Sequence, residues 1–347
     1  MAAADEGQPS DTMKERAEES TWVLWLMLDA DRRLVTGLFS ALLFAIVIAV
    51  GYLHPTPAHV MLSRGDPTET LFQALIGGTI TGVTLVLTLS QLVLSQELGA
   101  VGDQRDRMRG AMEFRDDVAD AVGTRVSPAE PSAFLRSLVR ATGEQAEEIR
   151  ATVEKDDMDE EERTLVTQYL DSITGNADAV AEELEGANFG EFDVLKAALN
   201  YNYSWKLYAG RRIREEYDDA LSEATESKLE QLTDTLELFG PAREHFKTLY
   251  FQWELSNLSR ALLYVAVPAL GVAICGELFF DPRDFQQASM GVVDSLWLMA
   301  LLVTLSLTPF TVLLAYILRI VTITKRTLSI GPFILRETDR SVDVNWD

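Results

Sequence analysis

"GGTITGVTLVLTLSQLVLSQ", residues 77–96, combines an uncharged apolar run with a regular polar pattern. The run extends back to residue 73 without a charged side chain, and a helix needs about 20 such residues to cross a bilayer. Small and polar residues recur at spacings of three and four, which keep them on one face of a helix. The stretch therefore predicts a transmembrane helix with a polar stripe made of Gly77, Thr81, Thr84, Thr88, Gln91 and Ser95.

Three further apolar runs, at residues 34–53, 261–276 and 292–318, have the length or composition of a membrane crossing. The long segment between the second and third runs is rich in Ala, Glu and Leu, and its apolar residues recur at helical spacing. The sequence thus predicts an all-α integral membrane protein. Four transmembrane helices are expected, with a helical cytoplasmic domain inserted between the second and third.

These patterns divide the chain into five predicted segments. They are a cytoplasmic N-terminal segment with an interfacial helix (1–33), a first transmembrane hairpin (34–98), the cytoplasmic helical domain (99–259), a second transmembrane hairpin (260–323) and a cytoplasmic tail (324–347). Few breaking residues separate the domain from the membrane runs. Its first helix is expected to continue the second transmembrane helix, and its last helix, from Pro241, to continue into the third.

Basic residues predict the orientation, because Lys and Arg favour the cytoplasmic side. The short loops 54–69 and 281–290 each contain one Arg, whereas the opposite flanks contain ten Arg and Lys residues near the membrane runs. A cell-membrane protein with several crossings and both termini in the cytoplasm is expected. The short run at residues 21–28, with Trp22 and Trp25, suits either the membrane interface or packing on the soluble domain.

The composition favours a salt-adapted protein. Acidic residues outnumber basic ones 54 to 30, the net charge is −24, and there are seven Lys against 23 Arg. Hydrated carboxylates tolerate multimolar salt because their repulsion is screened there. We interpret the chain as halophilic and haloarchaeal, with an acidic protein of an ordinary cell as the alternative. The charge argues against nucleic acid as a partner, which requires clustered bases.

No enzymatic motif is present, so an enzyme is not expected, and neither are catalytic residues, a metal site or a cofactor. His54 and His59 lie in a loop with two prolines and are better explained as ordinary loop residues than as metal ligands. The acidic run at residues 154–162 lacks the order of a calcium loop and is better explained as a solvated helix start. Arg211, Arg212 and Arg214 form a possible anion site, or pair with acids.

Two explanations of the polar stripe remain open. Several copies of the helix could surround a pore, with Gln91 as its constriction and Leu98, which continues the spacing, as a possible gate. Alternatively the stripe is a helix-packing seam. A second seam of similar spacing, which the first could pack against, is formed by Thr304, Thr308, Thr311 and Thr322.

The leading functional hypothesis is an oligomeric ion channel or pore-like membrane protein gated through the cytoplasmic helical domain. Its expected partners are the lipid bilayer, further copies of the chain and inorganic ions. The alternative is a non-conducting membrane scaffold or signalling anchor that presents the acidic helical domain. The layout of four crossings with a helical cytoplasmic domain is similar, in plan alone, to that of bestrophin-type channels.

Overall fold

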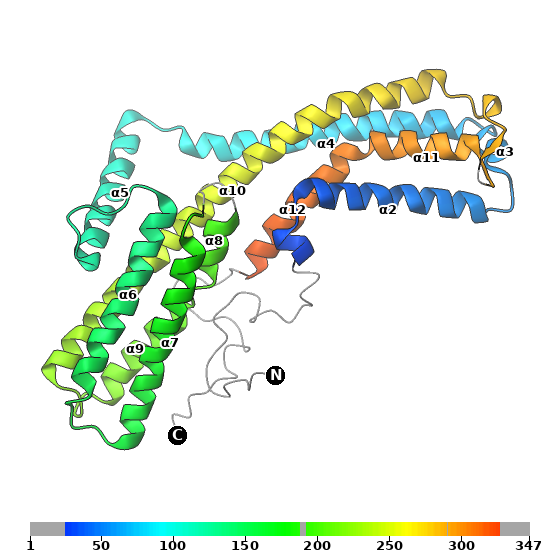
Figure 1. Cartoon of the computed structure of the whole chain (residues 1–347). Helices are drawn as coiled ribbons and strands as arrows, with labels where there is room; N and C mark the ends of the chain where they lie inside the picture. The colour runs from blue at the N-terminus through cyan, green and yellow to red at the C-terminus, as the bar shows by residue number, and fades with distance from the viewer. Residues whose placement is uncertain (1–24, 188–191, 290, 327–347) are drawn as a thin grey trace. The chain divides into compact units, whose positions relative to one another are not determined.

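The structure is a computed structural model, and it describes residues 25–187, 192–289 and 291–326. In these ranges the chain is all-α apart from one short antiparallel strand pair (Figure 1). The elements are η1 (Trp25–Asp29), α2 (Arg32–Leu53), α3 (Ala58–Leu62), α4 (Pro67–Glu97), α5 (Val101–Val122), α6 (Pro131–Val153), α7 (Glu160–Leu184), α8 (Phe192–Leu199), α9 (Tyr203–Glu216), α10 (Glu223–Phe279), η2 (Pro282–Asp284), β1 (Ala288–Ser289), β2 (Val292–Val293), α11 (Asp294–Ser306) and α12 (Thr308–Arg326).

Among the described residues, three helices are long and apolar enough to cross a membrane: Arg32–Leu53, Pro67–Val93 and the C-terminal part of Glu223–Phe279. A fourth crossing is available if α11 and α12, which meet at a bend of 50°, form one span. The all-α prediction is therefore confirmed, together with helices suited to membrane insertion. The predicted N-terminal segment up to residue 24 and the tail from residue 327 lie outside the described residues.

The chain divides into two compact units. The apolar unit contains Trp25–Leu98 and Gln252–Ile323, and the helical unit contains Gly99–Phe251. In the apolar unit α2, α4, α11 and the C-terminal part of α10 lie side by side (Figure 1). Close packing there depends on small residues: a Cβ built on Gly276 would lie 2.5 Å from the ring of Phe72, and one on Gly51 equally close to Leu296.

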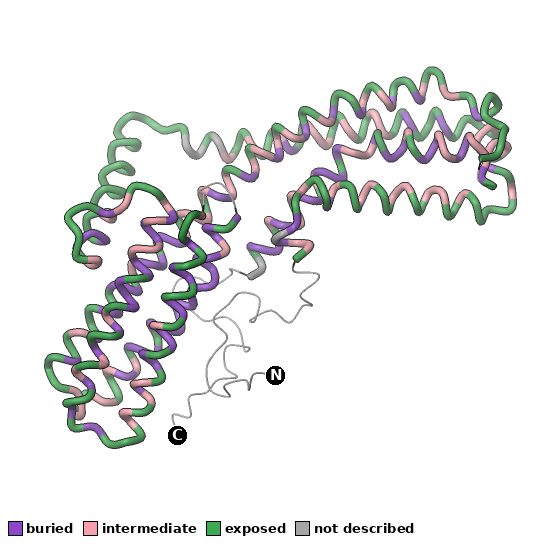
Figure 2. Tube along the Cα trace, viewed as in Figure 1, coloured by how far each residue is buried: buried purple, intermediate pink, exposed green. Residues whose placement is uncertain are grey.

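The helical unit has a core of its own, formed mainly by α6, α7, α8, α9 and the N-terminal part of α10. Figure 2 shows buried stretches alternating with exposed ones along α6 and α7, as expected for helices with one face in the core. The acidic run predicted to start a helix does so, because Asp159 and Glu162 form a reciprocal capping box at the start of α7. Some buried polar groups pair across the core, as in the hydrogen bond of 2.6 Å between Thr142 Oγ1 and Tyr201 OH.

Helix continuity differs from the prediction in three places. The second membrane run does not continue into the helical unit, because α4 ends at Glu97, Leu98 is extended and α5 begins at Val101. Conversely, α10 begins well before Pro241 and runs through it without a break. The fourth run is two helices, with Pro309 just after the break; a proline supplies no backbone N–H to continue the preceding helix.

Within the short run at residues 21–28, the described part from Trp25 onward lies in the π-helical segment η1, whereas Trp22 lies outside the described residues. Leu28 and Ala30 are buried, and Ala30 packs with Val35 and Ala315 of the apolar unit.

Salt is expected to stabilise the helical unit. Partial desolvation, and then the neighbouring carboxylates of Glu237 and Glu230, raise the pKa of Asp234 above its usual value, although the residue as a whole is exposed. Since its folded pKa is raised, ionised Asp234 costs stability at neutral pH, and that cost is relieved as the pH falls through the folded pKa. Screening by salt relieves the repulsive part of the same cost.

We therefore expect residues 99–259 to lose helicity and melt earlier when KCl falls from molar to millimolar concentration. Circular dichroism during thermal unfolding measures both. Sucrose at the osmolality of molar KCl is the control, and it should not restore the loss because it screens no charge. An unchanged melting temperature across the KCl series would contradict the interpretation of the acidic composition as salt adaptation.

Candidate functional site

One face of α4 is packed within the apolar unit. Phe72 and Val86 are buried, and Val86 contacts Leu258 and Leu262 of α10. The hydroxyls of Ser90 and Ser259 share a hydrogen bond of 2.5 Å on the same side. Near the other end of the helix, Gln73 Nε2 donates to Glu277 Oε1 at 3.0 Å. This packing fixes how α4 is rotated about its own axis.

The polar stripe lies on the opposite face of α4. Phe72 and Val86 are 14 positions apart, so they lie on one face of the helix, and the same holds for Gly77 and Gln91. Gly77 follows Phe72 by five positions, which places the stripe about 140° around the helix from the packed face. The stripe is exposed at every position: Gly77, Thr81, Thr84, Thr88, Gln91 and Ser95. Large apolar side chains that are also exposed, including Leu85 and Leu92, flank it. No element of this chain within the described ranges covers the stripe.

The hydroxyls of the stripe are partly satisfied by their own helix. Thr88 Oγ1 donates to the carbonyl of Thr84 at 2.8 Å, and Ser95 Oγ donates to the carbonyl of Leu92 at 2.6 Å. Such local bonds lower the cost of a hydroxyl in an apolar medium. The amide of Gln91 makes no hydrogen bond with any described residue, so it is the stripe's largest unsatisfied polar group.

Leu98, the possible gate, follows the last residue of α4 and is three-quarters exposed. Its backbone is extended, so the helical spacing that assigned it to the stripe does not continue to it. The structure therefore places Leu98 at the end of the apolar unit without aligning it to the polar face.

The second seam does not pack against the stripe. Thr304, Thr311 and Thr322 are buried and Thr308 is half-buried. Thr311 Oγ1 shares a hydrogen bond of 3.1 Å with Ser40 Oγ of α2. Thr322 Oγ1 lies 3.6 Å from the sulfur of Met27. These contacts hold α12 against α2 and η1, so the seam stabilises the apolar unit while the stripe stays uncovered.

The three arginines of the possible anion site are each paired with a carboxylate. Arg211 pairs with Glu237, and Arg214 lies 3.9 Å from Glu230. Arg212 bonds Glu216 at 3.0 Å, and this hydrogen bond raises the pKa of the guanidinium. Their positive charge is thus neutralised within the helical unit, which corresponds to the acid-pairing alternative.

A largely buried ion pair lies in the apolar unit, and few features of the sequence indicated it. Arg32 Nη2 and Glu254 Oε1 are 2.5 Å apart, with side chains 14% and 9% exposed. The Arg32 guanidinium also lies 5.2 Å from the ring centre of Tyr316. Nearby in the fold, Arg319 Nη2 donates to the carbonyl of Ala30 at 2.5 Å. The one available signal was that Glu254 directly follows the aromatic stretch at positions 250–253, just before the apolar run at residues 261–276.

A family described as one of unknown function (DUF7972) matches residues 1–347. No curated protein and no solved structure matches the chain.

Proposed function

The chain belongs to this family of unknown function, and from its fold and site we propose that it is a four-pass membrane protein that forms an oligomeric ion channel. The observation that carries the proposal is the exposed polar stripe on α4. The stripe follows a helix apolar and long enough to cross a membrane, and the apolar unit leaves it uncovered.

A polar stripe facing lipid would be costly. An amide without a hydrogen-bond partner in an apolar medium costs about 2–7 kcal/mol, and Gln91 has no partner among the described residues. Water, or another copy of the chain, removes this cost. Hydroxyls and one amide can solvate a passing ion without holding it as tightly as a charged ring would.

One α4 helix per subunit cannot enclose water, so the proposal requires a ring of copies. In such a ring the stripes face the central axis, and the exposed apolar residues on the flanks, such as Leu85 and Leu92, pack against neighbouring copies. The alternation of a narrow polar stripe with apolar flanks supports this arrangement better than contact with lipid all round.

Four crossings follow if α11 and α12 serve as one bent span. The helical unit and both termini are then cytoplasmic, as the distribution of Arg and Lys predicts. Gating is proposed to act through α10, because this one helix contributes residues to both units. A rotation or tilt of α10 would reach the face on which α4 packs.

Labelling of single cysteines tests the orientation. In a Cys275→Ser background, His54→Cys is expected to react quickly with an impermeant thiol reagent added to intact cells, because it lies in a proposed outer loop. Asp178→Cys, equally exposed on the helical unit, should react after the cells are opened. Reaction of Asp178→Cys in intact cells would overturn the proposed topology.

Subunit number tests the function itself. Particle images of the purified protein should show a symmetric ring with α4 innermost. A monomer or dimer whose stripe is buried between two helices would instead leave the non-conducting scaffold, which presents the acidic helical unit to other proteins.

A further inference from the structure

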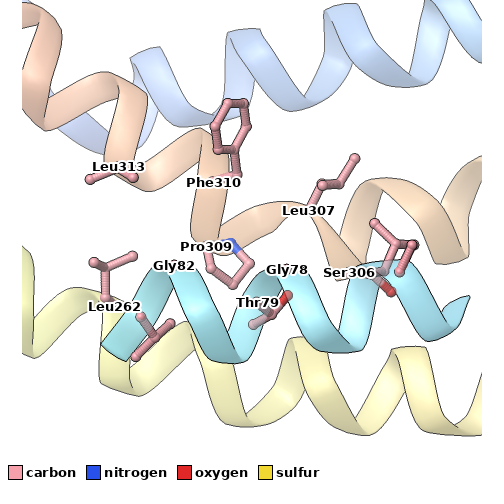
Figure 3. Close-up of a pocket in the computed structure, with 12 residues that line it drawn as sticks. Gly78, Thr79, Gly82, Leu262, Ser306, Leu307, Pro309, Phe310 and Leu313 are labelled. Atoms are coloured by element: carbon pink, nitrogen blue, oxygen red, sulfur yellow. The ribbon is translucent and has the colours of Figure 1, made fainter. Parts of the chain in front are cut away.

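A cavity of about 240 Å³ lies inside the apolar unit, where α4 faces the break between α11 and α12. Figure 3 shows Gly78, Thr79 and Gly82 on α4 opposite Pro309 and the residues around it. Leu262 of α10, together with Leu307 and Phe310 beside the break, completes an uncharged wall. The cavity lies on the side of α4 between the packed face and the polar stripe.

Two glycines keep this cavity open. A Cβ built on Gly78 or Gly82 would meet no atom within 4 Å. Both residues are near the middle of the candidate span Pro67–Val93. A molecule that reaches the cavity in a membrane would therefore arrive from the hydrocarbon layer, which excludes charged compounds.

The wall also holds two hydroxyls. Ser306, at the end of α11, is 1% exposed, and its Oγ is buried with no hydrogen-bond partner among the described residues. A buried hydroxyl without a partner is costly, and this one lies beside the cavity with its donor unused. Thr79 contributes the second hydroxyl. Two hydroxyls are few for a cluster of ordered water, which needs several polar contacts per molecule.

We propose that this cavity binds a small uncharged molecule with an apolar body and one oxygen, such as an aromatic alcohol, taken up from the bilayer. An apolar protein cavity of about 150 Å³ already admits benzene, so a ring with a short polar substituent fits here. The apolar body packs on Gly78, Gly82 and Phe310, and the Ser306 hydroxyl donates to the oxygen. The site is separate from the stripe and holds whether or not the protein conducts.

Photolabelling in liposomes tests the site with a diazirine derivative of benzyl alcohol as the probe. Labelling is expected to saturate and to concentrate on the residues around Gly78 and Phe310, as mapped by mass spectrometry. Benzyl alcohol should compete better than toluene at the same membrane concentration. Ser306→Ala should weaken competition by benzyl alcohol about fivefold, the worth of one neutral hydrogen bond, and leave toluene unchanged.

Gly78→Leu should abolish labelling at the cavity, because its side chain fills the open space. Gly37→Leu is the matched control, since a Cβ there also meets nothing within 4 Å but lies away from the cavity. Diffuse labelling that does not saturate would mean ordinary lipid chains only and would overturn the proposal. A second result would also overturn the proposal: no labelling at the cavity, together with disulfide cross-linking of Phe310→Cys between two copies of the chain. The cavity would then be filled by a neighbouring subunit.

Discussion

Replacing Glu254 with glutamine is expected to lower the free energy of unfolding of the apolar unit by about 3–5 kcal/mol, the usual cost of removing one partner from a buried ion pair. Arg32 then remains charged in a site where it is 14% exposed and has lost the carboxylate 2.5 Å away.

Thermal unfolding in detergent measures this loss. Arg32→Met should be similarly harmful, whereas the double variant Arg32→Met with Glu254→Met should recover most of the stability, because both charges of the pair are removed together. Glu237→Gln is the control: it breaks the pair with Arg211, in which both side chains are about half exposed, and should cost about 1 kcal/mol or less. Equally small losses of stability for Glu254→Gln and Glu237→Gln would show that the pair of Arg32 with Glu254 stabilises the protein no more than an exposed ion pair does.

Replacing Gln91 with leucine is expected to reduce ion flux sharply while the oligomer still assembles. In the proposed ring the leucine side chains form an apolar constriction at the point where ions and water pass, and such constrictions resist wetting. An added barrier of about 1.4 kcal/mol already reduces a rate roughly tenfold. Thr84→Leu should act in the same direction from seven positions away on the same face.

Flux into liposomes, measured beside thermal stability in detergent, separates the two explanations of the stripe. If the stripe only packs against another helix, Gln91→Leu removes a hydrogen bond worth about 0.6 kcal/mol, and there is no flux to lose. Leu92→Met, on the apolar flank, is the control and should leave flux unchanged because it conserves volume. Flux that survives both Gln91→Leu and Thr84→Leu would exclude the stripe as the conduction path.

The sequence predicted the features that depend on local pattern. Uncharged runs of sufficient length identified the apolar helices, and the spacing from Gly77 to Ser95 identified one face of α4. The direction of that face could not be predicted, because it depends on contacts such as Phe72 with Gly276, which are far apart in the chain. The pair of Arg32 with Glu254, 222 positions apart, was hidden for the same reason.

Breaks in helices were harder to predict than helices. Pro268 and Pro309 both mark possible kinks, yet α10 continues through Pro268 while α11 and α12 separate beside Pro309. A proline in an apolar helix is tolerated when neighbouring groups satisfy the freed carbonyl, so the outcome depends on tertiary contacts. The break after Glu97 was missed because a glycine such as Gly99 weakens a helix by only about 0.5–1 kcal/mol, which does not by itself end one.

The most direct test of the central claim, that the stripe on α4 faces water inside the membrane, compares two neighbouring positions. Thr84→Cys and Leu85→Cys, each in a Cys275→Ser background, lie at the same depth on exposed parts of α4 but about 100° apart. An impermeant thiol reagent reacts with the thiolate, which forms in water and not in lipid. We expect Thr84→Cys in liposomes to react at least roughly tenfold faster than Leu85→Cys. Equally slow reaction at both positions would contradict the claim.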